Sequence, residues 1–287
     1  MAALRRGEDR RRRAMAEISA KEVMALRNKT GLSMMECKKA LVESGGNQDA
    51  AEDLLKKKLG KKMEGRTDRA AGEGRVAVKI ADDGRSAVIV ELRAETDFTA
   101  KNEKFGAVAE RIADLALAEG KAGGVAPTDE MKAPIEDLKI STGENVSIAR
   151  IHRLEGGGGS KFGRYVHHDG KTGVLLHATG SVSDDVARDI CMHIAAYVPR
   201  PQGVSRDDIP AETVEREVRL LREKMEEEGK NPEMIERIVE GKKNALYGEL
   251  ALLEQPFVKD ESVKIKDLLK DDGQIGSFIR WRVGEAG

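Results

Sequence analysis

Two segments of this chain carry the same order of hydrophobic patterns, 86 positions apart. Residues 76–118 give an alternating run, an Asp83-Gly84 pair, a second alternating run, a loop and a helical stripe, and residues 164–198 repeat this order around Asp169-Gly170. Asp-Gly between alternating runs is typical of a β-hairpin, in whose turn we expect both central residues to have positive φ. The same offset aligns Val88 with Val174, Val108 with Ile194, and Ala109 with Ala195. The pattern predicts an α+β core of two related subdomains with antiparallel sheets; chance recurrence of a common arrangement is the alternative.

The first repeat contains a loop between a predicted strand and a predicted helix. Residues 86–94 alternate in the period of two that a strand requires. The apolar residues that follow recur at intervals of three and four, as in an amphipathic helix: Phe105, Val108, Ala109, Ile112, Leu115 and Ala116. Between the two lies the sequence Glu-Thr-Asp-Phe-Thr-Ala-Lys-Asn, residues 95–102.

Phe98 has no evident local partner in this 95–102 loop. If Thr99 is the N-cap, the staple position pairs Phe98 with Glu103 rather than with an apolar residue. We therefore expect an exposed ring beside the carboxylate of Asp97, an arrangement that can act on a partner. The alternative is that Phe98 extends the helical stripe back through Asn102 to Phe105.

Residues 17–59 are predicted to form a compact three-helix domain. Ser19-x-x-Glu22 and Ser33-x-x-Glu36 are capping boxes, in which each side chain satisfies a free backbone amide. Gly31 and Gly45 stand where helices should end. Residues 60–74, rich in Lys, Arg and Gly, are interpreted as a flexible linker.

The first residues are strongly basic, with six arginines between positions 5 and 13. We interpret residues 1–16 as a disordered basic tail or a mis-assigned start, with nucleic-acid contact as the alternative.

The core is interrupted by a charged segment. We assign residues 75–145 to the first subdomain, 146–210 to the second, and 251–287 to a return to the second that ends in a strand. Residues 146–154 are predicted to form another strand, at the start of the second subdomain. Residues 211–250 carry apolar side chains at spacings of three and four, interrupted by Gly229-Lys230-Asn231-Pro232. This predicts an antiparallel helical hairpin that projects from the core; two ordinary surface helices are the alternative.

Composition restricts the classes of function. The 50 basic residues nearly balance the 51 acidic ones, which argues against a general polyanion binder. Cys37 and Cys191 have no metal-ligand spacing and are expected to be reduced, as in a cytoplasmic protein, with a disulfide as the minor alternative. No apolar run approaches the roughly 18 residues of a membrane span, so no membrane association is expected.

No catalytic constellation is found in the sequence. No serine lies in a Gly-x-Ser-x-Gly turn, and residues 156–161 lack the spacing of a phosphate-binding loop, so no nucleotide site is expected. A metal site formed by His167, His168 and His177 across the second hairpin is a rival hypothesis; solvent-facing strand residues are the simpler interpretation. An RNA-binding adaptor built on the three-helix domain is another rival.

Four motifs resemble the signatures of the translation elongation factor Ts family, in the family's order. They are Thr-Asp-Phe-Thr-Ala-Lys-Asn at 96–102, Leu-Arg-Asn-Lys-Thr-Gly at 26–31 followed by Met-Met-Glu-Cys-Lys-Lys-Ala-Leu at 34–41, Cys-Met-His-Ile-Ala-Ala at 191–196, and Gln-Pro-Phe-Val at 255–258. The resemblance implies a guanine-nucleotide exchange factor, without cofactor or covalent catalysis, whose partner is elongation factor Tu in its GDP-bound and nucleotide-free forms. It also implies that the three-helix domain is similar to ubiquitin-associated domains.

The resemblance implies roles for particular residues. The residues expected to contact elongation factor Tu and displace its Mg²⁺ are Thr96, Asp97, Phe98 and Thr99. Further contacts are expected from Thr172, Gly173, Met192 and His193. The three-helix domain is expected to contribute Arg27, Thr30, Gly31, Met34 and Met35. Thr99 and Thr172 depart from the aliphatic residues that are common in the family at these positions.

Overall fold

The computed structural model describes residues 18–65 and 68–285, and it confirms the predicted α+β class. The chain forms two compact units. Unit 1 contains the described residues up to Gly74, together with Leu92–Val108 and Pro127–Ala149; unit 2 contains Arg75–Glu91, Ala109–Ala126 and the described residues from Arg150 onward. The predicted basic tail, residues 1–16, lies outside the described residues.

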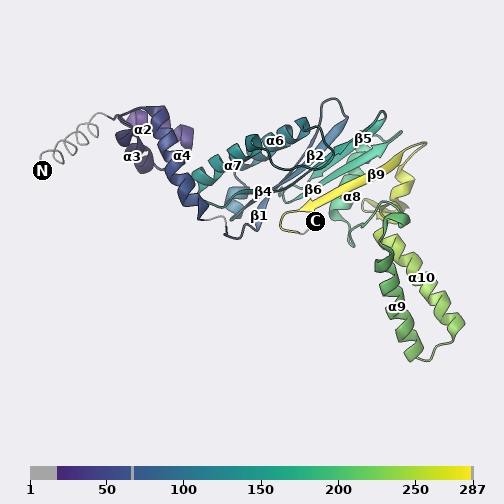
Figure 1. Ribbon diagram of the computed structural model, residues 1–287. Helices are drawn as coiled ribbons and strands as arrows, with labels where there is room; N and C mark the ends of the chain where they lie inside the picture. Colours follow the sequence, from purple (N-terminus) through teal and green to yellow (C-terminus); the bar gives the residue numbers. More distant parts are fainter. Residues whose placement is uncertain (1–17, 66–67, 286–287) are drawn as a thin grey trace, which may run out of the picture. The chain divides into compact units, whose positions relative to one another are not determined.

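Unit 1 contains the predicted three helices, α2 (Ala20–Thr30), α3 (Met34–Glu43) and α4 (Gln48–Glu64), which lie close together in Figure 1. Both predicted capping boxes form: Ser19 N donates to Glu22 Oε2 over 2.7 Å, and Ser33 Oγ donates to Glu36 Oε2 over 2.7 Å. The core between the helices is made of small and aliphatic side chains: Val23, Leu26, Leu32, Cys37, Ala40, Leu41, Ala51 and Leu55. Helix α4 continues to Glu64, into the segment that we predicted to be a linker.

Helix α7 (Asp129–Thr142) also belongs to unit 1 and was not predicted, since Pro134 lies inside it. Its apolar side chains nevertheless recur at helical spacing and are buried, at Met131, Ile135 and Leu138. The helix contacts the three-helix domain, because Ile140 packs against that core and Lys56 Nζ lies 3.4 Å from a carboxylate oxygen of Asp137.

A four-stranded sheet has the order β1-β2-β4-β3. Its strands are β1 (Glu73–Ile80), β2 (Ser86–Ala94), β3 (Gly123–Gly124) and β4 (Ser147–Glu155), and β3 pairs antiparallel with β4. Our prediction placed β4 at the start of the second subdomain, whereas the structure places it beside β2. The buried carboxylate of Glu91 on β2 explains this placement, because Arg150 Nε on β4 donates to it over 2.7 Å.

Unit 2 contains a second, antiparallel sheet of three strands, in the order β5-β6-β9. They are β5 (Ser160–Val166), β6 (Thr172–Thr179) and β9 (Gln274–Arg282). Helix α8 (Asp184–Ala196) packs against this sheet and buries Ile190, Cys191 and Ile194. Figure 1 shows the helix beside the sheet. Both cysteines of the chain are buried free thiols.

The two predicted hairpins have the same turn. Gly84 N donates to Ala81 O over 2.9 Å, and Gly170 N donates to His167 O over 2.8 Å. In each turn the Asp side chain accepts a hydrogen bond from the amide two residues later. Only the glycines have positive φ, at 67° and 72°, so the prediction of positive φ at both central residues was wrong. Each loop contains four residues, 82–85 and 168–171, instead of the two expected, and only the glycine at its third position has the left-handed conformation.

Both hairpins are followed by a helix, as predicted. Helix α6 (Glu103–Ala118) follows β2, and it buries the predicted stripe at Phe105, Ala109, Ile112 and Ala116. Helix α8 follows β6 in the same way.

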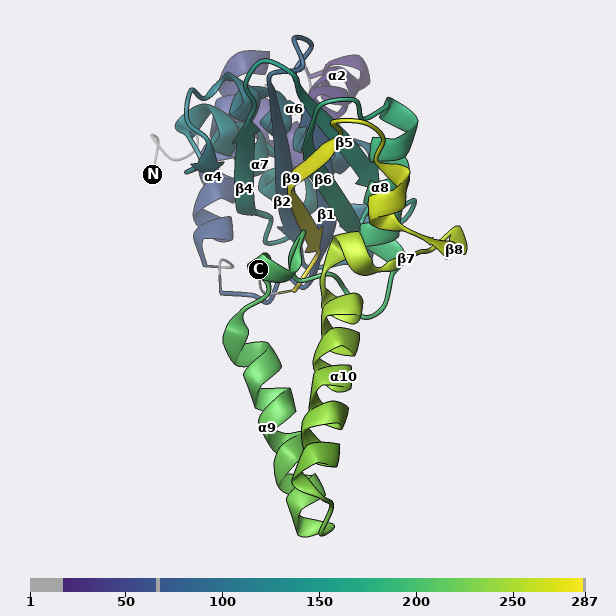
Figure 2. The same ribbon diagram turned by 90° about the vertical axis from the view of Figure 1, so that its right-hand side faces the viewer.

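The helical hairpin consists of α9 (Ala211–Glu227) and α10 (Pro232–Leu250), and it confirms the antiparallel pair predicted for 211–250. Figure 2 shows the two helices side by side, extending from the rest of unit 2. Asn231 caps α10 through a 2.9 Å bond from Glu233 N, and Pro232 occupies the first turn. Buried side chains join the helices, including Val214, Ile235, Val239 and Leu246.

The remaining elements of unit 2 are short. A small antiparallel pair is formed by β7 (Pro256–Phe257) and β8 (Asp260–Lys264). Single 3₁₀ turns lie at Arg206–Asp208, Leu252–Glu254 and Ile265–Leu268.

Candidate functional site

The 95–102 loop exposes Phe98 on a single helical turn in unit 1. This turn, α5 (Asp97–Ala100), places Thr99 and Ala100 in the interior and leaves 83% of Phe98 accessible to solvent. The expected exposure of Phe98 is therefore confirmed, and its alternative role in the helical stripe is excluded. The N-cap is Thr96 rather than Thr99, since Thr96 Oγ1 accepts from Thr99 N over 3.3 Å. Thr99 is buried because its side chain points into unit 1 from the same turn.

The loop is held by the residues that follow α7. The carboxylate of Glu144 accepts two hydrogen bonds from Thr96, one from the backbone amide (3.1 Å) and one from the hydroxyl (2.7 Å). Asn145 N donates to Glu95 Oε1 over 2.7 Å, and Asn145 Nδ2 donates to Arg69 O over 2.8 Å. The loop residues just before Phe98 are therefore fixed by hydrogen bonds to Glu144 and Asn145, while the ring itself remains exposed.

Asp97 lies beside Phe98 and is paired with Lys101. Lys101 Nζ lies 2.7 Å from Asp97 Oδ2, one helical turn away, and this hydrogen bond raises the pKa of Lys101. The side chain of Asp97 remains 39% exposed. The loop therefore presents an aromatic ring and an ionised carboxylate on adjacent residues.

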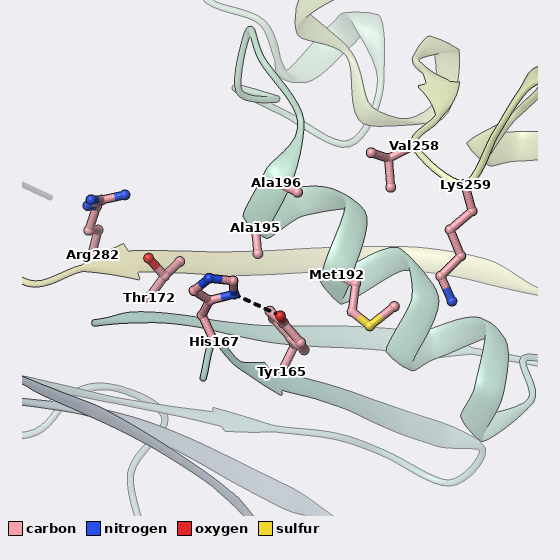
Figure 3. A pocket seen from close by; sticks show the side chains of 9 residues that line it. All are labelled: Tyr165, His167, Thr172, Met192, Ala195, Ala196, Val258, Lys259 and Arg282. Carbon is pink, nitrogen blue, oxygen red and sulfur yellow. Dashed lines mark hydrogen bonds between the residues drawn. The ribbon is translucent and has the colours of Figure 1, made fainter. Parts of the chain in front are cut away.

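A second candidate surface lies in unit 2, in a pocket of about 400 Å³ that we call the hairpin pocket (Figure 3). Its lining comes from β5, β6, α8 and β9 and from the segment after β7: Tyr165, His167, Thr172, Met192, Ala195, Ala196, Val258, Lys259 and Arg282. Tyr165 Oη and His167 Nδ1 lie 2.9 Å apart, as the dashed line shows. The structure thus brings together Thr172 and Met192, two of the residues predicted to contact a partner. Thr172 is buried, with only 5% of its surface accessible, which argues against the expected direct contact by its side chain.

His193 lies inside unit 2, and this burial corrects the expectation of a direct contact. Its ring is fully buried, with Nε2 2.9 Å from Gln255 Oε1. Val258 N donates to His193 Nδ1 over 3.2 Å, so the proton of the neutral ring is on Nε2. Burial lowers the pKa of His193, partly opposed by the bond to Gln255. His193 therefore supports the segment that carries Val258, and it joins the Cys-Met-His and Gln-Pro-Phe motifs.

Gly173 is also buried, contrary to its expected role as a surface contact. A Cβ atom at this position would lie 2.3 Å from Val76 Cγ1 of the neighbouring sheet. Only glycine fits here, so Gly173 serves the packing of unit 2.

The predicted contact residues of the three-helix domain are mostly exposed. Met34 is 37% and Met35 62% accessible, and Arg27 is exposed on α2. Gly31 ends α2 with φ 75°, and Thr30 Oγ1 donates to Leu26 O over 2.8 Å, so these two residues shape the α2–α3 junction. Met24, which the sequence analysis did not single out, is 44% accessible.

The proposed histidine cluster does not form. In the register of β5 and β6, His177 pairs with Phe162, whereas His167 lies five residues farther along at the turn end of the same hairpin, about 17 Å away at the rise of a strand. Among the residues that the structure describes, no group of three His, Cys, Asp or Glu side chains could hold a metal ion.

Comparison with known proteins decides the family. The sequence model of the family described as Elongation factor TS matches residues 95–285, which include the 95–102 loop and the hairpin pocket. The chain belongs to the elongation factor Ts family. It is 40% identical over 270 residues to elongation factor Ts of Teredinibacter turnerae, covering 93% of this chain and 91% of that protein. It is 41% identical over 272 residues to elongation factor Ts of Saccharophagus degradans, covering 93% and 92%.

Several site residues of this elongation factor Ts family member escaped the sequence analysis. Glu144 and Asn145 lie almost 50 positions from the loop they hold, so no local pattern links them to it. His167, Lys259 and Arg282 reach the hairpin pocket from three separate segments. The family motifs could have pointed to this pocket, since Val258 of the Gln-Pro-Phe-Val motif lines it.

No helix in the described ranges is long and apolar enough to cross a membrane.

Proposed function

We propose that this chain is a guanine-nucleotide exchange factor for elongation factor Tu. It binds the GDP-bound form, displaces Mg²⁺ and GDP, and stabilises the nucleotide-free form until GTP binds. The observation that carries this proposal is Phe98, an aromatic side chain 83% exposed beside Asp97 in the family's Thr-Asp-Phe motif. Such a ring adds little to the stability of its own domain, and its place in the family's motif supports a contact with a partner, since buried aromatic side chains often dominate the binding energy of an interface.

In the proposed mechanism, Phe98 enters the nucleotide-binding domain of elongation factor Tu and separates packed side chains near the Mg²⁺ site. The carboxylate of Asp97 arrives beside it and perturbs the surroundings of the ion. GDP is held largely because Mg²⁺ offsets the charge of its phosphates. Once the ion is displaced, the phosphates are repelled and GDP leaves.

Phe98 cannot supply the whole effect. An acceleration of about 10⁴-fold requires about 5.5 kcal/mol off the barrier. Burial of one Phe side chain provides about 1.5 to 3 kcal/mol. Further contact surfaces are therefore part of the proposal.

The hairpin pocket is the second proposed contact surface. Its lining includes the apolar side chains of Met192, Ala195 and Val258 and the cationic side chains of Arg282 and of Lys259, whose Nζ lies 2.8 Å from Asp189 Oδ1. This combination suits an apolar side chain of the partner flanked by acidic residues. Met192, which is half-buried, is the predicted contact that this pocket can present, since Thr172 is buried.

The three-helix domain is the third proposed surface. Met24, Met34 and Met35 are exposed there, and unbranched methionine side chains adapt well to a partner surface. Arg27 adds a cation on α2.

We further propose that the protein acts in the cytoplasm, without covalent catalysis and without a nucleotide, nucleic acid or cofactor of its own. The two buried free cysteines and the nearly balanced charge support this setting.

Timing the release of labelled GDP from elongation factor Tu tests the proposed function. Adding this protein should accelerate release at a fixed Mg²⁺ concentration. An unchanged release rate at saturating protein would contradict the proposal.

A further inference from the structure

The exposed turn that carries Phe98 has an incomplete capping box. In a complete box, the N-cap residue accepts from the amide three positions later, and a Glu or Gln there accepts from the N-cap amide. Thr96 makes the first of these bonds, but the third position is Thr99, which is buried and has no carboxylate. The boxes of α2 and α3 are completed locally by Glu22 and Glu36.

Glu144 supplies the missing carboxylate from 48 positions away. It accepts from Thr96 N over 3.1 Å, which is the bond that a local Glu would make. It also accepts from Thr96 Oγ1 over 2.7 Å, which directs a hydroxyl lone pair towards Thr99 N. Both oxygens of one carboxylate thus fix the N-cap residue, and hydrogen bonds to a charged group are among the stronger ones.

Glu144 is itself fixed by the end of α7. Gly143 ends this helix in the left-handed conformation, with φ 72° and its amide bonded to Lys139 O. Glu144 N then donates to Thr142 Oγ1 over 3.2 Å, and the next residue bonds Glu95. The same helix packs on the three-helix domain through Ile140 and Asp137. Helix α7 therefore carries both the three-helix domain and the turn with Phe98.

We propose that Glu144 is a positioning residue for nucleotide exchange: its carboxylate completes the capping box of α5 and holds Asp97 and Phe98 in the orientation that enters the partner. This inference rests on the proposed function. Because the carboxylate comes from Glu144, just after α7, instead of position 99, Thr99 is free to pack inward while Phe98 points outward. Without Glu144 the turn would lose the two hydrogen bonds that fix its N-cap residue, Thr96, and the ring of Phe98 would sample many orientations.

The first test is hydrogen exchange in the free protein, comparing wild type with Glu144→Ala and Glu144→Gln. The amides of residues 96–100 should exchange about tenfold faster in Glu144→Ala, since a pair of charged hydrogen bonds is lost. Glu144→Gln should lie between, because its single carbonyl oxygen can replace only one of the two acceptors. Glu136→Ala is the matched control: Glu136 is an exposed carboxylate on α7, the helix that precedes Glu144, and it pairs with Lys139 three positions away. Unchanged exchange in both Glu144 variants would overturn the proposal.

The second test separates positioning from simple loss of structure. GDP release from elongation factor Tu is measured against protein concentration. Glu144→Ala should lower the maximal release rate about tenfold and change the half-saturating concentration less, because the other contact surfaces remain. Glu144→Gln should restore part of the rate, and Glu136→Ala should match wild type. If wild type accelerates release and both Glu144 variants equal it, the positioning role is wrong while the proposed function stands. If wild type itself leaves release unchanged, the proposed function fails, and the role in exchange falls with it.

Discussion

At the scale of single residues, Phe98 and Phe105 form a natural pair of experiments. They lie seven positions apart in unit 1, yet Phe98 is 83% exposed and Phe105 is fully buried. Phe98→Ala should slow GDP release from elongation factor Tu and change the free energy of unfolding by less than about 0.5 kcal/mol. Phe105→Ala should lower that free energy by about 3 to 5 kcal/mol, because it leaves a cavity. Thermal unfolding and exchange kinetics of both variants check this; an early-melting Phe98→Ala with normal exchange would contradict it.

His193 gives a prediction for pH. Burial lowers its pKa below the value of about 6.5 expected in the unfolded chain. Between these two pKa values the unfolded state binds more protons, so the free energy of unfolding falls as the pH is lowered below about 6.5. One such group contributes at most about 1.4 kcal/mol per pH unit in that window. Burial also lowers the pKa of His152 and His177, which act in the same direction.

Imidazole ¹⁵N spectra of the folded protein at pH 7 should show His193 neutral, with its proton on Nε2. Urea unfolding of His193→Gln should show a shallower dependence on pH between 6.5 and 5.5 than wild type, although the variant is less stable at pH 7. An imidazolium signal for His193 at pH 6.5 would contradict the assignment.

The roles of residues whose partners are close in the sequence were predictable, whereas the roles of residues whose partners are distant in the sequence were not. Phe98 could be identified because the staple position pairs it with Glu103 if Thr99 is the N-cap, and because its neighbours match a family motif; periodicity alone left a place in the helical stripe open. Glu144 could not, because its partner Thr96 is brought to it only by folding. His193 was misplaced for the same reason: its buried partners, Gln255 and the amide of Val258, lie more than 60 positions away.

At the scale of elements, the helical hairpin should open independently of the rest of unit 2. Its helices are joined by a narrow line of buried side chains, while most of its surface is charged. Ile235→Ala, at a position 4% exposed, removes part of that line and should cost about 2 to 5 kcal/mol locally. Hydrogen exchange should then accelerate in residues 211–250 and remain unchanged in β5 and β6.

Met234→Ala is the matched control for this element. Met234 precedes Ile235 on α10 but is 55% exposed, so its loss should leave hydrogen exchange in the hairpin nearly unchanged. Acceleration throughout unit 2 in Ile235→Ala would show instead that the hairpin and the sheet unfold together.

Element types followed from the sequence, whereas their pairing did not. The alternation in residues 86–94 gave β2 with its bounds, and the Gly229–Pro232 break gave the helical hairpin. Strand β4 was recognised but assigned to the wrong sheet, because alternation does not identify a strand's neighbour. Glu91 could have indicated the neighbouring strand, because a carboxylate in a buried strand requires a nearby cation. Arg150 on β4 provides that cation.

At the scale of the whole molecule, the proposed activity must be distributed over several modest contacts. A near-zero net charge gives little long-range attraction for polyanions, so binding depends on local complementarity. Phe98, the hairpin pocket and the exposed methionines each offer a small apolar surface. Removing one should weaken exchange without abolishing it.

Thermodynamic linkage makes the last prediction independent of which contact dominates. If this protein lowers the affinity of elongation factor Tu for GDP by some factor, GDP must lower the affinity of Tu for this protein by the same factor. The Kd of the protein should therefore be larger for GDP-bound than for nucleotide-free Tu, by the ratio of the GDP Kd values measured with and without the protein. Titration calorimetry of both forms checks this equality, and Phe98→Ala should reduce both ratios together. Equal affinity for the two forms would contradict the exchange mechanism, because a ligand that binds two states equally cannot shift the balance between them.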